Sequence, residues 1–216
     1  MSHMGSIYFP SCNFTKASPQ AAKKLRDWMK ERMPVAGCCR TDKREYPAGD
    51  RALYFCQACR EGLEQRFPQL APENLFVWLD REGGLALPDY SGLTVSVQDC
   101  WRDRDHPEIH RAVRGLLSKM GVAVREIEAN REQAEFCGNL HFQPQRPEAI
   151  ALIDARPNTP LFQFPEEEQR AIFAEQLEKH GNMPVLCYCN RCKLGIETAG
   201  GRALHLMELA MGTYPG

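Results

Sequence analysis

The stretch that decides the fold is Leu93-Thr94-Val95-Ser96-Val97-Gln98-Asp99-Cys100. Its apolar and β-branched positions predict a buried strand, and this strand runs directly into a cysteine. Ile7-Tyr8-Phe9 leads into Pro10-Ser11-Cys12 in the same way. A helical pattern follows each of these strands, and an open α/β sheet places its ligand site at the carboxyl ends of its strands. The sequence therefore predicts parallel sheets with cysteines at that edge.

The other expected elements continue this alternation of strands and helices. A helix is expected to start with Ser18 as its N-cap and Pro19 as its first residue, and Pro34 ends it. A strand, a helix and a fully buried strand are then expected at 53–55, 59–66 and 75–79. Farther along, a helix begins near Pro107 and is closed by Gly121. The remaining elements are a strand at 122–127, a helix at 166–179, a strand at 184–188 and a last helix at 202–211.

The two series of elements predict two domains of one plan. We expect an α/β protein of two tandem βαβ-type, Rossmann-like parallel-sheet domains related by pseudo-twofold repetition. The first is expected at residues 7–85 and the second at 92–216, with the segment 83–91 as the linker between them. A length of 216 residues accommodates two domains of about 100 residues each.

Composition excludes several classes of function. Hydrophobic residues make up 43% and charged residues 25%, which is typical of a globular protein. A net charge of −1 indicates neither a nucleic-acid partner nor an anionic membrane surface. No apolar run approaches the ~20 residues that span a bilayer, and no signal peptide is visible, so a cytoplasmic protein is expected. The opening segment 1–6 resembles an expression-vector remnant, which removes His3 from consideration.

All ten cysteines fall into two copies of one spacing scheme. Each copy has an isolated cysteine, a second position farther along the chain, and then a CxxC pair. In a reducing cytosol such cysteines favour metal or redox chemistry over structural disulfides, and a chain of this length needs no staples to build a core. The first copy comprises Cys12, Cys38, Cys39, Cys56 and Cys59, and the second comprises Cys100, Cys137, Cys187, Cys189 and Cys192.

The adjacent pair Cys38-Cys39 favours a cluster over a single ion. Side chains of neighbouring residues diverge, so both thiolates can bind only if they reach different irons of an extended cluster. Tetrahedral zinc is saturated by four ligands, and the first copy offers five cysteines. The second copy leaves zinc open as an alternative, because Cys100, Cys137, Cys189 and Cys192 make four.

At this point the sequence resembles the cysteine-rich CCG-domain family, which includes heterodisulfide reductase B-like proteins and related iron–sulfur subunits of glycerol-3-phosphate dehydrogenase and lactate utilisation. The matching pattern is a cysteine, a Cys-Cys-Gly motif and a CxxC pair, duplicated along the chain. The segment Phe136-Cys137-Gly138 and the helical pattern 203–209 carry the closest similarity. The chain departs from the family pattern at Arg40, where the family has glycine, and at Phe136, where it has the first cysteine of the doublet. The stretch from Cys39 to Cys56 is also shorter than is usual in the family.

The resemblance implies an iron–sulfur oxidoreductase subunit that acts on a disulfide, a thiol or a related sulfur substrate. The five cysteines of the first copy would hold a non-cubane [4Fe–4S] cluster, with Cys38 and Cys39 as the catalytic pair. Cys100, Cys137, Cys189 and Cys192 would hold a cubane, or a non-cubane cluster with Cys187 as fifth ligand. Electrons would come from a redox partner, either a ferredoxin-like protein or a flavoprotein subunit. The alternatives are an electron carrier without its own substrate and a zinc-stabilised binding module.

Other candidate residues carry weaker signals. His106 and His110 are spaced to share a helix face, and His141 lies near Cys137, but solvated or structural roles are the more frequent ones for such histidines. His205 is expected to pack on its helix. Phe136 is a candidate shield between a cluster and water, and Arg40 is a candidate to attract an anionic substrate or to lower cysteine pKa values.

Overall fold

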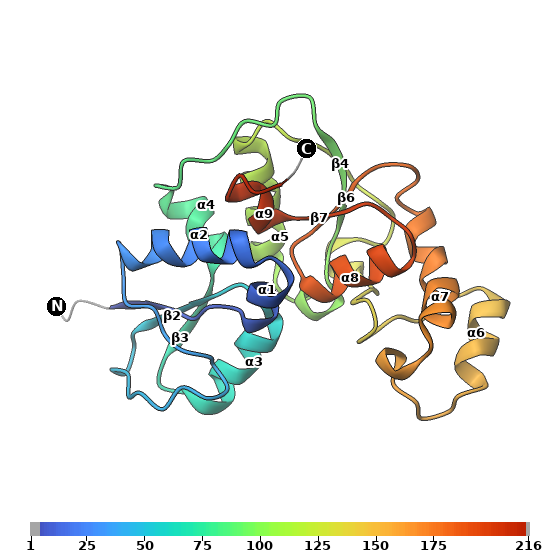
Figure 1. Ribbon diagram of the computed structural model, residues 1–216, viewed down its shortest axis with the longest axis horizontal. Helices are drawn as coiled ribbons and strands as arrows, with labels where there is room; N and C mark the ends of the chain where they lie inside the picture. Colours follow the sequence, from blue (N-terminus) through green and yellow to red (C-terminus); the bar gives the residue numbers. More distant parts are fainter. Residues whose placement is uncertain (1–4, 215–216) are drawn as a thin grey trace.

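The computed structural model describes residues 5–214 and contains two parallel sheets covered by helices (Figure 1). The three-stranded sheet has the order β1-β2-β3, and all its pairings are parallel. Figure 1 shows α2 on one side of this sheet and α3 on the other. The elements of this first half are β1 (Ser6–Tyr8), α1 (Cys12–Ala17), α2 (Pro19–Lys30), β2 (Arg51–Tyr54), α3 (Gln57–Arg66), β3 (Ala71–Asn74) and α4 (Leu75–Glu82).

The second half is built around a four-stranded parallel sheet of order β5-β4-β6-β7. Helices α6 and α7 form the end of the molecule farthest from α2 (Figure 1). Gly121 ends α5 with a φ of +70°, which suits a glycine after the helix C-cap. The elements are β4 (Thr94–Gln98), α5 (Pro107–Lys119), β5 (Ala123–Arg125), α6 (Pro147–Asp154), α7 (Glu166–Glu178), β6 (Val185–Cys187), α8 (Asn190–Thr198), β7 (Ala203–His205) and α9 (Leu206–Ala210), with short 3-10 turns η1 (Trp101–Asp103), η2 (Arg131–Gln133) and η3 (Leu161–Gln163).

The prediction of an α/β protein with parallel sheets is confirmed, and the two sheets share one topology. Strands β1, β2 and β3 occupy the same spatial order as β4, β6 and β7. Val35 bridges Tyr8 in parallel on the free side of β1, which is where β5 pairs with β4 in the other sheet. Each sheet ends in a strand that leads without a loop into a short helix, α4 after β3 and α9 after β7.

Each half has a short helix that packs against a longer helix of the other half. The α4 helix of the first half packs on α5 of the second. Conversely, the end of α9 meets α2, where the Nζ atom of Lys24 donates to the carbonyl oxygen of Met211 at 3.1 Å. One hydrophobic core contains side chains of both halves, including Leu25, Phe55, Val113 and Leu186. The two sheets are therefore joined by a shared interior.

Two sequence-based expectations are wrong in kind. Residues 75–79 form the first turns of α4 rather than a buried strand, because the side chain of Asn74 accepts a hydrogen bond from the amide of Phe76 at 2.9 Å and caps a helix there. A short apolar run has no periodicity that separates a buried helix from a buried strand. Residues 202–211 are likewise not one helix, since β7 occupies Ala203–His205 before α9 begins.

The sequence patterns did not predict several of the shorter elements. The helices α1 and α6 were not expected, and the third strand of the first sheet lies at Ala71–Asn74, just before the expected position. Ser18 does stand before Pro19 at the start of α2, but its side chain makes no capping hydrogen bond. Its hydroxyl donates instead to the Glu208 carboxylate of α9, which is a contact between the halves. Within residues 5–214, no helix is long and apolar enough to cross a lipid bilayer.

Candidate metal centre

Both CxxC motifs occupy the same position relative to a strand and a helix. Cys56 is the N-cap residue of α3, and Cys189 is the N-cap residue of α8. Each follows a central strand of its sheet, and the second cysteine of the motif lies in the first turn of the helix. Cys100 is similarly the residue before η1, directly beyond β4. The positive end of a helix stabilises a thiolate, so this arrangement favours deprotonated sulfur at Cys56 and Cys189, which begin α3 and α8.

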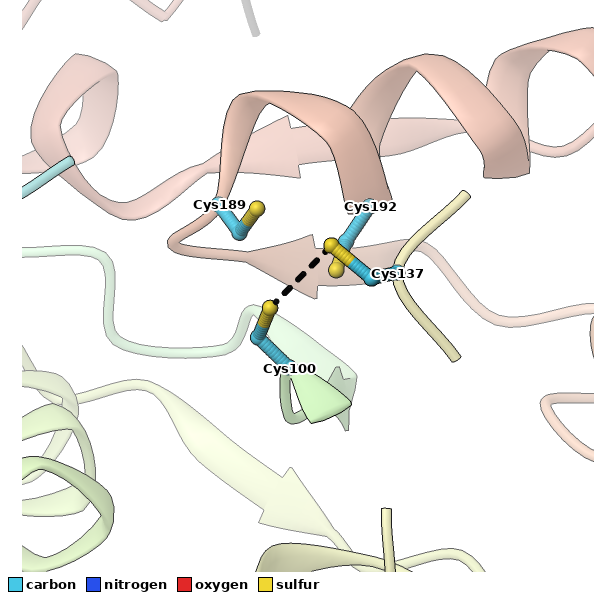
Figure 2. Close-up of side chains that lie close together, drawn as sticks. All are labelled: Cys100, Cys137, Cys189 and Cys192. Atoms are coloured by element: carbon cyan, nitrogen blue, oxygen red, sulfur yellow. Dashed lines mark hydrogen bonds between the residues drawn. The ribbon is translucent and has the colours of Figure 1, made fainter. Parts of the chain in front are cut away.

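Four cysteines of the second half form one compact group. The sulfur atoms of Cys100, Cys137, Cys189 and Cys192 all lie within 4.8 Å of one another, and all four residues are buried. Figure 2 shows that Cys189 and Cys192 come from one helix, that Cys137 comes from a separate loop, and that Cys100 ends a strand. The Sγ atoms of Cys100 and Cys137 are 3.5 Å apart. We refer to these residues as the four-cysteine group.

Backbone contacts fix the loop that carries Cys137. The amide of Cys137 donates to the carbonyl of His141 at 2.7 Å, and the carbonyl of Phe136 accepts from the amide of Trp101 at 3.1 Å. The amide of Cys100 donates to the hydroxyl of the buried Tyr188 at 3.1 Å. These bonds connect the three separate segments that supply the sulfurs, so the group is held by the backbone as well as by packing.

Glycine allows this loop to approach α8. Gly138 has a φ of +53°, and a Cβ added to it would lie 2.1 Å from the carbonyl oxygen of Arg191. On the facing side of α8, a Cβ on Gly195 would lie 2.6 Å from the Cα of Gly138 and 2.6 Å from the ring of Phe136. Gly62 occupies the corresponding place in α3, six residues after Cys56, as Gly195 is six residues after Cys189. This shared spacing is a signal in the sequence that the cysteine pattern alone does not reveal.

Hydrogen bonds and burial divide the four-cysteine group into donors and an acceptor. The other three thiols donate toward Cys189 and lower its pKa well below the usual value. Burial raises the pKa of Cys100 and of Cys192 well above the usual value. Without a metal, Cys189 is therefore the thiolate of the group, and it accepts hydrogen bonds from the other three thiols. Because all four thiolates are needed to bind a metal, loading would release protons.

The five cysteines of the first half are in contact but less tightly gathered. The Sγ atoms of Cys12 and Cys38 are 3.1 Å apart, and the Cys59 thiol hydrogen-bonds with both Cys39 and Cys56. Cys12 is exposed and Cys38 is half-buried, whereas Cys39, Cys56 and Cys59 are buried. Among residues 5–214, these five do not form a group as compact as the four in the second half.

Several cysteines of the first half have displaced pKa values. The hydrogen bond from Cys59 lowers the pKa of Cys56 to about 6 and that of Cys39 to about 7, and the charge of Arg40 contributes to the latter. Burial and the neighbouring Cys38 raise the pKa of Cys12 to about 11. The first set is therefore partly ionised near neutral pH, which is the state required of sulfur ligands and nucleophiles.

The two cysteine sets face one another across the junction of the halves. Helix α1, which begins at Cys12, contacts α8, which follows Cys189. The charge of Cys189 is one of those acting on the pKa of Cys56. Beside them, the buried carboxylate of Asp103 accepts from Arg60 at 2.9 Å and from the Gln57 amide, both in α3. The junction therefore holds both sulfur sets together with a buried ion pair.

The structure places the remaining candidate residues outside the four-cysteine group. Cys187 is buried at the end of β6, in the position that Tyr54 occupies in β2, and it does not join the group. The ring of His141 stacks on Trp101 at 3.8 Å. His106 bonds to Glu108 at 3.0 Å, and both ring nitrogens of the buried His110 lack a hydrogen-bond partner in the described part of the chain.

Phe136 and His205 are two fully buried aromatic residues with different roles. Phe136 is fully buried and packs against Phe142 and Phe173, so it helps to seal the four-cysteine group from water. His205 caps α9 rather than packing within a helix: its Nδ1 atom accepts from the amide of Met207, and its ring packs on Phe14. The Nδ1 contact leaves the proton on Nε2, which has no acceptor among the described residues although the charge of Cys189 acts on this ring.

The donor set fits a thiophilic metal. Four buried sulfurs on three segments match the ligand sets of zinc and of iron–sulfur centres. A single tetrahedral ion with metal–sulfur bonds of ~2.3 Å holds its sulfurs about 3.8 Å apart. The 4.8 Å limit is compatible with that spacing. A cluster with one thiolate on each iron requires a wider spacing.

Comparisons with known proteins add no assignment. A scan against protein-family models found no match, and a search of curated proteins found no matching relative.

Proposed function

We propose that this chain is an iron–sulfur oxidoreductase subunit that reduces a disulfide, or runs that reaction in reverse. Its sulfur chemistry would take place at the first cysteine set. The four-cysteine group, whose sulfurs would move apart to accept a cluster, would relay electrons. The resemblance to heterodisulfide reductase B-like proteins, which the cysteine spacing and the pattern at 203–209 carry, agrees with this proposal.

The observation that carries the proposal is the unequal exposure of two sulfur sets at equivalent sheet edges. The four-cysteine group is sealed, with Cys100, Cys137 and Cys192 at 0% exposure. In the first set, Cys12 is exposed, and Cys12 and Cys38 line a cavity of about 560 Å³. A buried site excludes substrate and suits electron transfer, whereas an open site with exposed sulfur can meet a substrate.

Reduction of a disulfide consumes two electrons and two protons and releases two thiols. When bound, a [4Fe–4S] centre would supply single electrons and an iron that accepts a substrate sulfur. Cys12, Cys38, Cys39, Cys56 and Cys59 would hold that centre at the open cavity. The electrons would come from a ferredoxin-like or flavoprotein partner, because the sequence has no flavin motif. Cys38 lines the cavity, whereas Cys39 is buried and is not among the lining residues, so Cys38 is the member of the pair that a substrate in the cavity would meet.

A second candidate function is a zinc-stabilised binding module. It is favoured by the compactness of the four-cysteine group, because all four sulfurs lie within 4.8 Å of one another and a tetrahedral zinc site needs about 3.8 Å. In this case the group would stabilise the second half, and the open first set would have no electron source.

Metal analysis after anaerobic purification separates the two candidates. We expect iron and acid-labile sulfide in equal amounts and a paramagnetic resonance signal after reduction. Cys192→Ala should remove the metal of the four-cysteine group, whereas Cys187→Ala should retain it. The two replacements are matched, since both residues are fully buried cysteines of the second half. Zinc without sulfide would contradict the oxidoreductase proposal and support the module.

A further inference from the structure

The cavity at the first cysteine set has a marked excess of positive charge. Its lining includes Cys12 and Cys38 together with Lys16, Arg26 and Lys30, and no acidic side chain of the described residues takes part. The full lining is Pro10, Cys12, Thr15, Lys16, Arg26, Lys30, Val35, Ala36, Gly37 and Cys38. The whole chain has a net charge of −1, so this excess is a local feature.

Two of the three cations have no counter-charge. Lys16 and Arg26 form no salt bridge within residues 5–214, while Lys30 lies 3.6 Å from Asp27. Elsewhere on α2, Lys23 pairs with Asp27 at 2.8 Å, so the surface of this helix is not simply basic throughout. Unpaired cations that line the same cavity as exposed sulfur provide recognition for a negative group attached to a sulfur compound.

The dimensions and the chemistry of the cavity agree. About 560 Å³ lies within the range of small-molecule sites. Its wall combines a cationic side on α1 and α2 with apolar atoms of Pro10, Val35 and Ala36. A ligand with an aliphatic sulfur portion and an anionic end matches both parts of this wall.

We propose that the cavity selects a small, negatively charged disulfide or thiol, whose anionic group is held by Lys16 and Arg26 while its sulfur lies at Cys12 and Cys38. This inference rests on the proposed function, and it names the substrate class of the same site. Lys16 and Arg26 are binding residues in this scheme and take no part in electron transfer.

Binding of unreactive sulfides tests the inference without requiring turnover. Thiodipropionate carries two carboxylates, thiodiglycol is its uncharged counterpart, and neither can exchange with a thiol. Titration calorimetry with the full chain, purified anaerobically and kept at low ionic strength, should show tighter binding of thiodipropionate. Lys16→Gln combined with Arg26→Gln should weaken that binding about tenfold, as expected for the loss of two exposed charge contacts.

A matched control and a turnover assay separate this inference from the proposed function. Lys23→Gln removes a cation from the same helix outside the cavity and should leave binding unchanged. Equal binding of both sulfides, or equal weakening by Lys23→Gln, would overturn the inference. Reduction of dithiodipropionate and of hydroxyethyl disulfide is measured in parallel with a viologen reductant. Charge-selective binding without turnover of either disulfide would support the anion-binding cavity and contradict the proposed oxidoreductase activity. Equal turnover of the charged and the uncharged disulfide would support that activity and contradict the selection of anions by the cavity.

Discussion

Gly138 is the residue on which the closure of the four-cysteine group depends. Its positive φ is unfavourable for any side chain, and its backbone lies against the carbonyl of Arg191 in α8. The glycine of the Phe-Cys-Gly motif is therefore explained by packing, independently of any metal. Its contact brings Cys137 to the helix turn that holds Cys192.

Replacing Gly138 by alanine should destabilise the protein and impair metal binding. Gly181→Ala is the matched control, because its φ of +60° is similar to the +53° of Gly138 but its added Cβ would meet nothing within 4 Å. The control should cost about 1 kcal/mol from backbone strain, and Gly138→Ala should cost at least about 2 kcal/mol more from the clash. Urea unfolding and metal content provide the measurements. Equal losses in both variants would show that the close approach to Arg191 is unimportant.

At the residue scale the sequence indicates which side chains carry the chemistry but not how they gather. The spacing of the cysteines can be read directly, since CxxC places two thiols on one helix turn. Cys187 and Cys189 are two residues apart, yet only Cys189 joins the four-cysteine group, because Cys187 ends β6 whereas Cys189 is the N-cap of α8. The exposure of Cys12 and the unpaired cations beside it depend on the packing of α1 and α2 and have no sequence pattern.

Among the elements, length decides what sequence patterns can predict. Helices α2, α5 and α7 have 12 or 13 residues. This length is sufficient for the sequence to show either a repeating apolar face or recognisable residues at the helix ends. The short helices α4 and α9 have 8 and 5 residues, and both begin directly at the end of a strand. Their N-caps, Asn74 and His205, occupy equivalent places in the two halves. Recognising them requires knowledge of where β3 and β7 end.

The cap of α9 can be tested by using the residue found in α4. His205→Asn should preserve the cap, because Asn74 accepts from the amide of Phe76 just as His205 accepts from that of Met207. His205→Ala loses the cap and should be about 1 kcal/mol less stable than His205→Asn. Both variants remove the ring from its contact with Phe14, so their difference isolates the cap. Equal unfolding free energies would assign the role of His205 to its ring alone.

At the scale of the whole molecule, the two halves are held by contacts that also enclose the sulfur sets. The shared core supplies the apolar part of this junction. Its polar part joins α3 to η1, where Arg60 donates to the carboxylate of Asp103 and to the carbonyl of Arg102. Arg102 pairs in turn with Glu61. Repetition of one topology therefore produces an interior junction in which each half completes the surroundings of the other's cysteines.

Asp103 makes this junction sensitive to pH. Burial raises the pKa of Asp103 from 3.8 to about 6, against the opposing influence of Gln57 and Arg60. Because the folded pKa lies above the unfolded value, the folded state binds the proton more tightly between these limits. The contribution of Asp103 to stability is therefore greatest below about pH 4 and is lost as pH rises through about 6. A shift of about two units corresponds to roughly 3 kcal/mol.

Replacing Asp103 by asparagine should remove this pH dependence. We expect the unfolding free energy of the unmodified protein to fall relative to that of Asp103→Asn by about 3 kcal/mol between about pH 4 and pH 7, at matched metal content. Asp105→Asn is the control for the loss of a nearby carboxylate outside the junction, because Asp105 is an exposed neighbour of Asp103. Unfolding in urea at several pH values gives the curves. A difference that is constant with pH for Asp103→Asn would show that its carboxylate is accommodated as a charge by Arg60.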